Sequence, residues 1–249
     1  MATPLSPSKL VEVLRAEGLT VHEVRSWRTH NRNSKGPWGP VNGVMIHHTV
    51  TSGTEASVRI CYDGYAGLPG PLCHGVIDKK GHVHLVGNGR ANHAGLGDSD
   101  VLRAVVAERQ LPGDNEANTD GNRHFYGFEA INKGDGKDPW PREQLEAIEK
   151  VAAAICRHHG WNERSTIGHL EWQPGKVDPR GFGMDWLRGQ IRERLKPTVV
   201  YTVSRGDTLW SIAASKLGDG NRWREIADLN VLKNPDDITP GQKIKLPKK

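Results

Sequence analysis

Apolar positions in the first quarter of the chain predict a helix and then a strand. Over residues 7–17 the apolar side chains recur at helical spacing, between Ser6, which can cap a helix, and Gly18, which can end one. After a segment rich in Gly, Pro and Asn, the compact apolar run 44–46 predicts a strand. That strand would carry His47 at its end.

The middle of the chain continues with short strands. Apolar residues on both sides of the polar turn 78–81 predict a hairpin over 73–87. A long polar stretch follows, with a short helix expected over 101–109. Residues 125–131 then return to strand character, so Glu129 should lie within a strand.

The clearest helix is expected over 141–159, where the apolar residues share one face and Gly160 can end the helix. A short strand should precede His169, and a last helix is expected over 184–195. Because strands and helices mix without strict alternation, we expect an α/β domain with a mixed β-sheet flanked by helices.

The remainder of the chain has a different organisation. Its pattern predicts a small βααβ unit, with strands over 200–203 and 243–246 and helices over 208–216 and 222–230. A unit this small needs nearly all of its apolar residues for a core. We therefore expect a first domain over 1–195, a linker over 196–198 and a second domain over 199–249.

Composition and charge narrow the functional classes. The chain has 249 residues, 36% of them hydrophobic and 25% charged, as in folded globular proteins. The net charge of +5 suits an anionic partner such as a bacterial wall, but no dense basic stripe favours nucleic acid. No apolar run reaches the roughly 18 residues of a membrane helix, so membrane insertion is not expected.

The N-terminus and the cysteines suggest where the protein is made. The first residues lack the basic segment and apolar stretch of an export signal, so we expect synthesis in the cytoplasm. Cys61, Cys73 and Cys156 are an odd number without metal-type spacing, so free thiols are expected. No feature calls for more than a monomer.

Two histidines and one aspartate are the first candidates for chemistry. His47 ends one predicted strand, His169 follows another, and Asp178 lies in the loop beyond it. Two imidazoles and a carboxylate, with an open fourth position, are a ligand set typical of catalytic zinc. Spacing alone does not separate this set from structural histidines, because it has no short local signature.

Four ordered motifs strengthen the metal interpretation. They are VMIHHT at 44–49, NHAG at 92–95, YGFE at 126–129 and GHLEWQPGKVDP at 168–179. Together they resemble the type 2 N-acetylmuramoyl-L-alanine amidase family, which shares its fold with peptidoglycan-recognition proteins. The resemblance covers about 150 residues of the chain.

The resemblance implies a role for each matching position. Zn²⁺ would be held by His47, His169 and Asp178, Glu129 would be the catalytic acid and base, and Lys176 would stabilise the oxyanion. The implied reaction is hydrolysis of the amide bond between N-acetylmuramic acid and L-alanine in bacterial peptidoglycan.

Other positions near these motifs leave alternatives open. By resemblance His93 lines the substrate cleft, although a loop histidine bonded to backbone is an equally simple reading. Trp172 could contact substrate or pack a loop. His48 should point away from the metal. Cys73 stands where some relatives have a tyrosine, and we assign it no role; a buried small residue is the simple interpretation.

The tail carries a second resemblance. Segments 201–213, 226–230 and 238–246 resemble the lysin motif, LysM, nearly from end to end. The resemblance implies a shallow groove for glycans that contain N-acetylglucosamine, formed by loops 206–209 and 229–233. The candidate contacts are Gly206, Asp207, Thr208, Leu209, Leu229 and Asn230. Asp207 can instead be a turn residue beside the helix cap Thr208.

Taken together, the sequence predicts a bacteriolytic zinc amidase that acts at the cell wall, and the missing export signal favours a phage endolysin. One alternative is a peptidoglycan receptor of the same fold without catalysis, but all the implied ligands are present. Another is a glycosidase that acts on the same polymer through two carboxylates. An amidase releases amino groups, whereas a glycosidase releases reducing sugars.

Overall fold

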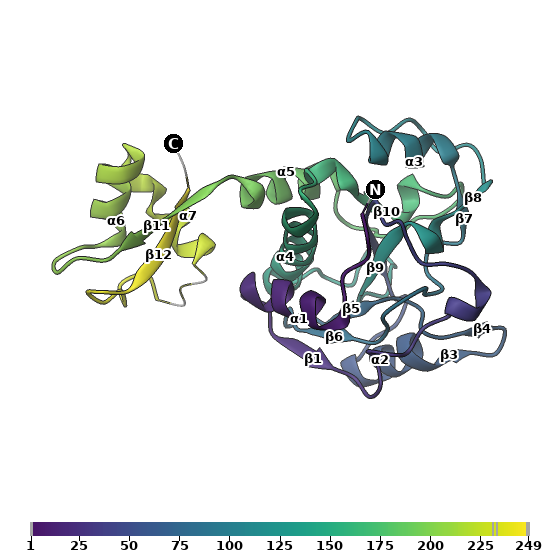
Figure 1. Ribbon diagram of the computed structural model, residues 1–249. Helices are drawn as coiled ribbons and strands as arrows, with labels where there is room; N and C mark the ends of the chain where they lie inside the picture. The colour runs from purple at the N-terminus through teal and green to yellow at the C-terminus, as the bar shows by residue number, and fades with distance from the viewer. Residues whose placement is uncertain (1, 231, 233, 248–249) are drawn as a thin grey trace. The chain divides into compact units, whose positions relative to one another are not determined.

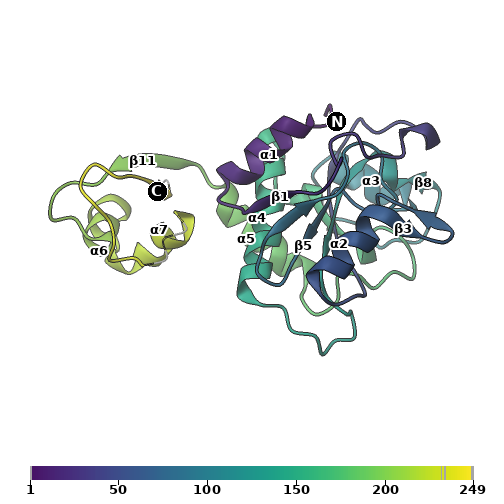
Figure 2. The ribbon, with the colours of Figure 1, turned by 90° about the horizontal axis from the view of Figure 1, so that it is seen from below.

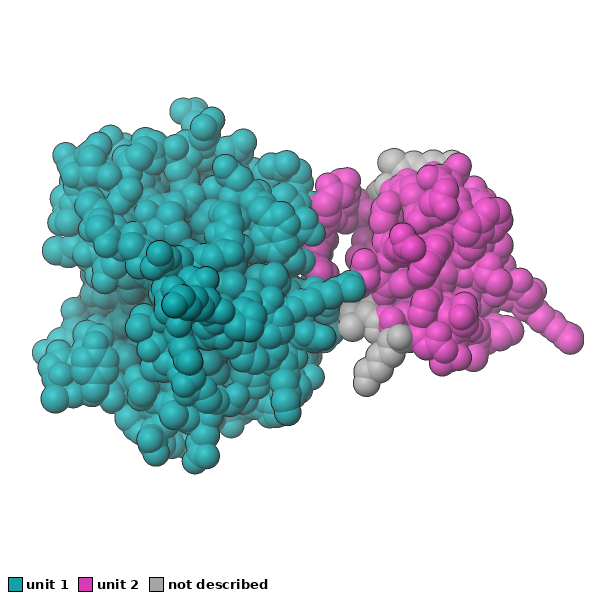
Figure 3. Space-filling view, turned by 180° about the vertical axis from the view of Figure 1, so that it is seen from behind, with its two compact units in different colours: residues 1–192 teal, residues 193–249 magenta. Residues whose placement is uncertain are grey.

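The computed structural model describes residues 2–230, 232 and 234–247, and the chain divides into two compact units. Unit 1 comprises residues 1–192 and unit 2 residues 193–249 (Figure 3). The metal-site candidates all lie in unit 1, and the lysin-motif segments lie in unit 2. Each unit is described separately below.

Unit 1 is built on a six-stranded sheet with the order β1-β6-β5-β9-β2-β10. These strands are β1 (Val21–Glu23), β2 (Gly43–His48), β5 (Gly75–Ile77), β6 (Val83–Leu85), β9 (Phe125–Ala130) and β10 (Thr166–Gly168). Only the β5–β6 hairpin is antiparallel; the other neighbours in this sheet are parallel. The prediction of a mixed sheet is confirmed, as is the hairpin.

Helices cover both faces of this sheet (Figures 1 and 2). They are α1 (Pro7–Ala16), α2 (Thr54–Asp63), α3 (Ser99–Val106), α4 (Arg142–His159) and α5 (Met184–Leu195). α1 packs with α4 on one face, and α2 lies against β5 on the other. Two short ribbons complete the unit: β3 (Gly64–Tyr65) with β4 (Leu68–Pro69), and β7 (Leu96–Gly97) with β8 (Thr119–Asp120).

The predicted helix ends have the expected chemistry. Ser6 caps α1, since its Oγ accepts a hydrogen bond from the Lys9 N–H. Gly160 ends α4 in the left-handed conformation, at φ 71°. α2 and β1 were not predicted. α2 buries only Ser57 and Cys61 and has no side-chain cap, so its apolar face is too small to show in the sequence.

The hydrophobic core of unit 1 lies between the central sheet and the helices that cover it. All six residues of β2 are buried, because helices cover the sheet on both sides. α4 contributes the largest helical share, with eleven buried residues. The three cysteines are free, as expected, and all three are buried. In the described part of the chain, no helix combines the length and apolar character needed to cross a membrane.

Unit 2 has the predicted βααβ order. It contains β11 (Thr198–Thr202), α6 (Leu209–Ile212), α7 (Trp223–Leu229) and β12 (Lys243–Pro247), with β11 antiparallel to β12. The expected first helix is shorter than predicted, because its second half, Ala213–Leu217, is a π-helical turn. A small core joins the four elements, made of Val203, Leu209, Ile212, Ala213, Leu217, Ile226, Ala227, Ile244 and Leu246.

Candidate metal centre and active site

Parallel strands bring the candidate residues to one edge of the sheet. β2 pairs with both β9 and β10, and the register places His47 beside Glu129. β10 ends at Gly168, so His169 follows at the same edge. Because carboxyl ends of neighbouring parallel strands meet at one edge, residues far apart in sequence converge there.

Three donor atoms meet at this edge. His47 Nδ1 lies 3.1 Å from His169 Nδ1 and 3.0 Å from Asp178 Oδ2, and His169 Nδ1 lies 3.1 Å from that same oxygen. His47 is 1% and His169 6% exposed. Burial lowers the pKa of His47 to about 4, so its ring is neutral near pH 7 and can offer a lone pair. These three residues could together hold a metal ion.

The loop that carries His169 and Asp178 is held in place by hydrogen bonds and an ion pair. Leu170 N–H donates to the Asp178 carbonyl at 2.8 Å, which closes the loop between His169 and Asp178. Glu171 accepts both the Gly168 N–H and a two-pronged contact from Arg188 of α5, at 2.8 and 2.9 Å. A paired arginine and carboxylate hold a fixed geometry, so α5 helps to place the donors.

Glu129 is a half-buried side chain beside the donor group. Burial raises the pKa of Glu129 well above its usual value, and the nearby Cys61 and Asp178 add to the shift. Its Oε2 is buried and, among the described residues, has no hydrogen-bond partner. A buried, unsatisfied carboxylate oxygen next to a possible metal site is typical of a catalytic group.

Cys73 lies near Glu129 but does not have the character of a nucleophile. Its side chain is fully buried, and burial together with the thiol of Cys61 raises the pKa of Cys73 well above its usual value. It therefore stays a protonated thiol. The simple interpretation of Cys73 as a buried small residue agrees with this environment.

His93 contacts a candidate ligand directly. Its Nδ1 lies 3.1 Å from His47 Nε2, and its Nε2 lies 3.3 Å from the Phe125 carbonyl. A Cβ at Gly127 would lie 2.4 Å from His93 Nδ1, so only glycine leaves room for this ring. The contact gives His93 a place behind His47, which the NHAG motif alone did not reveal. Gln173 has a similar position, with Oε1 3.3 Å from His169 Nε2.

His48 points away from the donors, as expected. Its Nδ1 accepts a hydrogen bond from the Arg180 N–H at 3.1 Å. Its ring lies against Gly134 in the loop after β9, where a Cβ would approach His48 Nε2 to 2.3 Å. Lys176 is exposed on the loop before Asp178, and its charge favours ionisation of Glu129.

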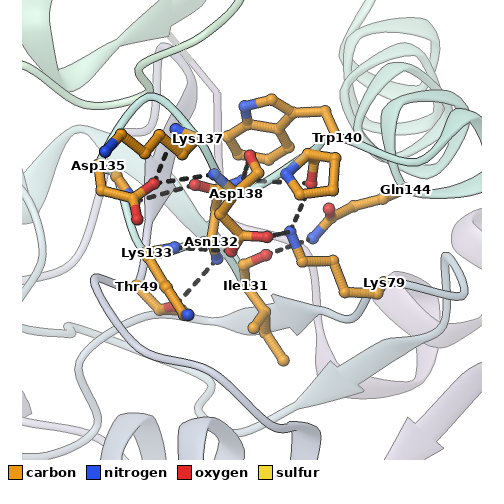
Figure 4. Close-up of polar contacts among 12 residues, drawn as sticks. Thr49, Lys79, Ile131, Asn132, Lys133, Asp135, Lys137, Asp138, Trp140 and Gln144 are labelled. Atoms are coloured by element: carbon orange, nitrogen blue, oxygen red, sulfur yellow. Dashed lines mark hydrogen bonds and ion pairs between the residues drawn. The ribbon is translucent and has the colours of Figure 1, made fainter.

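The loop between β9 and α4 is held by its own polar network (Figure 4). Asn132 donates to the Asp138 carbonyl at 3.0 Å, and Asp138 accepts the Lys133 N–H at 2.9 Å and pairs with Lys79 at 3.0 Å. Gln144 of α4 donates to the Ile131 carbonyl. These contacts fix the segment that follows Glu129.

Trp172 corrects one of the substrate candidates. Its side chain is fully buried, and its Nε1 donates to the Ala94 carbonyl at 3.0 Å. A Cβ at Gly97 would lie 2.2 Å from the indole, and one at Gly121 would lie 2.7 Å from it. Trp172 is therefore a core residue that ties the NHAG segment to the metal loop, and it cannot contact substrate.

His74 is a buried histidine that the sequence did not single out. Its Nδ1 accepts the Gly127 N–H at 2.9 Å, and its Nε2 lies 2.8 Å from the Gly89 carbonyl. These contacts define a neutral tautomer, with the proton on Nε2. Burial lowers the pKa of His74 to about 4.

The His74 environment predicts a loss of stability in acid. In the unfolded chain His74 titrates near 6.5, so between about pH 6.5 and 4 the unfolded state binds more protons. Stability from this group is therefore full above pH 6.5 and decreases as the pH falls toward 4, by about 2 kcal/mol at pH 5. Urea unfolding of the metal-free protein, above pH 6.5 and at pH 5, measures this decrease in the free energy of unfolding. His74→Gln should show a smaller one, and an equal decrease would contradict this assignment.

In unit 2, several predicted glycan contacts have structural partners. Asp207 Oδ2 accepts hydrogen bonds from Tyr201 Oη and the Ser204 N–H, and Thr208 caps α6 through Ser211. Asn230 joins α7 to β12, because its Nδ2 donates to the Lys245 carbonyl and its Oδ1 accepts the Lys245 N–H. These contacts shape the loops that the lysin motif would use.

The remaining candidates for glycan contact differ in how exposed they are. Leu209 is 3% exposed and packs in the core of unit 2, so its side chain is not a glycan contact, which corrects that prediction. Gly206 is exposed and Leu229 is partly buried. Val231 and Lys233, in the second predicted loop, lie outside the described residues. Trp210, at 58% exposure, is a surface aromatic residue that is not among the predicted glycan contacts.

The chain has limited similarity to solved structures that include an endolysin and a hydrolase. The endolysin N-acetylmuramoyl-L-alanine amidase LysCS from Clostridium intestinale URNW is 15% identical, with a TM-score of 0.45, over 69% of this chain and 95% of that one. The Staphylococcus aureus hydrolase AmiA is 13% identical, with a TM-score of 0.48, over 78% of this chain and 93% of that one.

Curated relatives match only a short segment. An uncharacterized protein of Deinococcus radiodurans is 48% identical over 48 residues, which cover 19% of each chain. The potassium binding protein Kbp of Escherichia coli O6:H1 is 43% identical over 49 residues, or 19% of this chain and 33% of that one. The chain thus spans about a fifth to a third of the length of these relatives.

Two family models match the two parts of the chain. The LysM domain model matches residues 201–247. The model of the N-acetylmuramoyl-L-alanine amidase family matches residues 37–181, which include all three metal candidates, Glu129 and Lys176. Since that match covers more than half of the chain, the protein belongs to the N-acetylmuramoyl-L-alanine amidase family.

Proposed function

We propose that this chain is a zinc-dependent amidase that hydrolyses the bond between N-acetylmuramic acid and L-alanine in bacterial peptidoglycan. The observation that carries the proposal is the meeting of His47 Nδ1, His169 Nδ1 and Asp178 Oδ2 beside Glu129, whose Oε2 is enclosed. Family membership supplies the substrate class. The receptor alternative lacks support, because a pure binder needs neither the donor set nor an acid with an enclosed, unpartnered oxygen.

The donor set fits zinc. The three atoms lie 3.0 to 3.1 Å apart, close to the spacing of about 3.3 Å between ligands around tetrahedral zinc. Two imidazoles and one carboxylate leave the fourth position for water or substrate. Zinc at this site would supply Lewis-acid activation of the amide carbonyl and of a water molecule.

The chain's own residues would move the proton. Glu129 would accept a proton from the attacking water as the new C–O bond forms, and then donate it to the L-alanine nitrogen as the C–N bond breaks. Its raised pKa suits the second role, while the positive charge of Lys176 and of a bound cation favours the carboxylate needed for the first. Lys176 would also stabilise the negative charge that develops on the carbonyl oxygen.

Product analysis tests this function. Incubation of purified peptidoglycan with the zinc-loaded protein should release new amino groups, identified as N-terminal L-alanine, without new reducing sugars. Reducing sugars without amino groups would instead show a glycosidase. Binding without either product would show a receptor.

The His93 contact predicts an effect on zinc affinity. By accepting from His47 Nε2–H, His93 would leave the His47 Nδ1 lone pair free for the metal. His93→Leu removes the acceptor, and zinc should bind about 10- to 100-fold more weakly in competition with a chelator. His158→Gln, on the exposed end of α4, is the matched control. Unchanged affinity in the His93 variant would contradict this role.

We propose that unit 2 holds the enzyme at the wall by binding glycans that contain N-acetylglucosamine. Its match to the LysM model supports this, and Gly206, Asp207, Thr208, Leu229 and Asn230 remain the candidate loop positions. A linked second site raises the effective concentration of the first at the substrate. That the protein is a monomer stays a prediction from the sequence.

Removal of unit 2 should separate binding from chemistry. A chain that ends at Pro197 keeps α5 complete. Its activity on intact cell walls should fall about 100-fold, the low end of the gain from linked sites, with little change on soluble muropeptide. Turbidity loss of wall suspensions and chromatography of muropeptides measure the two. Equal losses on both substrates would argue against wall binding by unit 2.

We further propose that hydrolysis of the assembled wall lyses bacterial cells. The pairing of an amidase-family unit with a LysM domain in one chain supports a site of action at the wall. A drop in turbidity of cells treated from outside, with release of cytoplasmic protein, would test it. The phage origin stays a prediction from the sequence.

A further inference from the structure

A second group of histidines lies outside the active site, at the other end of the sheet. β1 and β6 are parallel neighbours whose register pairs His22 with His84. His82 stands two residues before His84, so alternation along the strand places both on the same face. Val21 and Val83 are buried on the opposite face. Three imidazoles therefore share one face of two adjacent strands.

The three rings lie close together. The His22 and His84 rings are stacked with centroids 4.8 Å apart, and the His22 and His82 centroids are 5.3 Å apart. Asp78 Oδ2 lies 3.1 Å from His84 Nε2 and 3.7 Å from His82 Nδ1. Four possible ligand side chains are thus gathered in one place.

Asp78 is held in position for this group. Its Oδ1 accepts the N–H groups of Lys80 and His82, each at 2.9 Å, so the carboxylate cannot rotate freely. Burial alone would raise the pKa of Asp78, but hydrogen bonds from His84 and the backbone outweigh it and hold the pKa below its usual value. The carboxylate is therefore charged near neutral pH, and Oδ2 faces the imidazoles.

The group is open to solvent on one side. The Asp78 side chain is buried, whereas His82 keeps 38% and His84 15% of its side-chain surface exposed. His22 is exposed as well. An exposed imidazole can rotate about its side-chain bonds, so His22 can turn from its stacked position toward the Asp78 oxygen without disturbing the core.

We propose that His22, His82 and His84, with Asp78 as fourth ligand or as hydrogen-bond partner, form a second site for a divalent transition metal such as zinc. Imidazole nitrogens with a carboxylate are the donors that zinc, nickel and copper prefer. The site is distinct from His47, His169 and Asp178, and it uses no residue of the catalytic machinery.

The site would fasten an edge of the sheet. β1 is a terminal strand that pairs only with β6 in this sheet. A metal shared by His22 of β1 and His84 of β6 links the two strands. Because the unfolded chain does not gather these ligands, zinc raises the melting temperature, by an amount that grows with the logarithm of its free concentration above the dissociation constant.

Zinc titration of an untagged His169→Ala protein tests the site, because this background removes a ligand of the active-site group. Calorimetry should show one zinc bound per chain. Adding His22→Asn or His84→Asn should abolish that saturable binding, whereas adding His158→Gln should leave it intact. Asp78→Asn should weaken zinc binding by about 10- to 100-fold if the carboxylate acts as hydrogen-bond partner, and more if it is a ligand.

Melting temperatures separate metal binding from simple destabilisation. Zinc should raise the melting temperature of the His169→Ala protein but not of its His22→Asn derivative, even if the two melt alike without metal. A variant that is only less stable would melt lower and still respond to zinc. The proposal is overturned if the His169→Ala protein binds no zinc, or if the His22 and His84 variants bind it unchanged. Neither result depends on amidase activity.

Discussion

Glu129→Gln should lower amide hydrolysis by about 10²- to 10⁴-fold while zinc binding stays intact. Glutamine keeps the size and polarity of the side chain but can neither accept the proton of the attacking water nor return it to the leaving amine. Glu129 is not one of the three donors that meet at the strand edge, so the zinc content should match the unaltered protein. Release of amino groups from muropeptide and elemental analysis measure the two effects.

Glu129→Asp provides a matched comparison for this variant. It keeps the acid but shortens its reach, so partial activity is expected if the role is proton transfer at a defined distance. If Glu129→Gln retained full activity with zinc bound, another residue would have to supply the proton. Lys176, which is exposed, would then be the first candidate.

His169→Ala should remove zinc and activity together. The His169 ring supplies one of the three converging donors, and the remaining pair, His47 and Asp178, leaves too few ligands for a stable tetrahedral site. We expect hydrolysis below detection and no zinc at the active-site group after dialysis. The second histidine group, His22, His82 and His84, is unchanged in this variant. Zinc bound there is therefore determined separately, with the His22→Asn and His84→Asn variants.

His48→Asn is the matched control for His169→Ala. His48 lies next to a proposed ligand in the chain, yet its ring bonds to the Arg180 N–H on the other side of β2. Zinc binding at the active-site group should therefore survive in this variant. Full activity and zinc content in His169→Ala would rule out the proposed ligand set. Loss of zinc in His48→Asn would mean that His48, and not His47, is the ligand.

The sequence predicted the mixed sheet and the positions of the metal candidates because strand ends leave local signals. A buried apolar run followed by a histidine is visible at His47, and His169 follows a second short strand in the same way. The pairing of β2 with β9 and β10 then brings them together. These features depend on neighbouring residues, which is why they could be predicted from the chain alone.

Features that depend on contacts between distant segments could not be predicted. The burial of Trp172 needs space left by Gly97 and Gly121, and the place of His93 needs the missing side chain of Gly127. Each of these glycines lies in a segment remote from the ring that it accommodates. Glycines in otherwise regular strands are a signal that could direct such predictions, since they mark close approach of another group.

The complete burial of β2 has a consequence for how this protein can change over generations. A one-residue slip of the strand would exchange His47 for His48 and move every β2 side chain into the packed layer on the opposite face, so the adjacent histidine cannot replace His47. Insertions, deletions and recruitment of new substrates should therefore concentrate in the loops that frame the site, such as 132–140. The central strand should tolerate little beyond volume-conserving exchanges of its apolar residues.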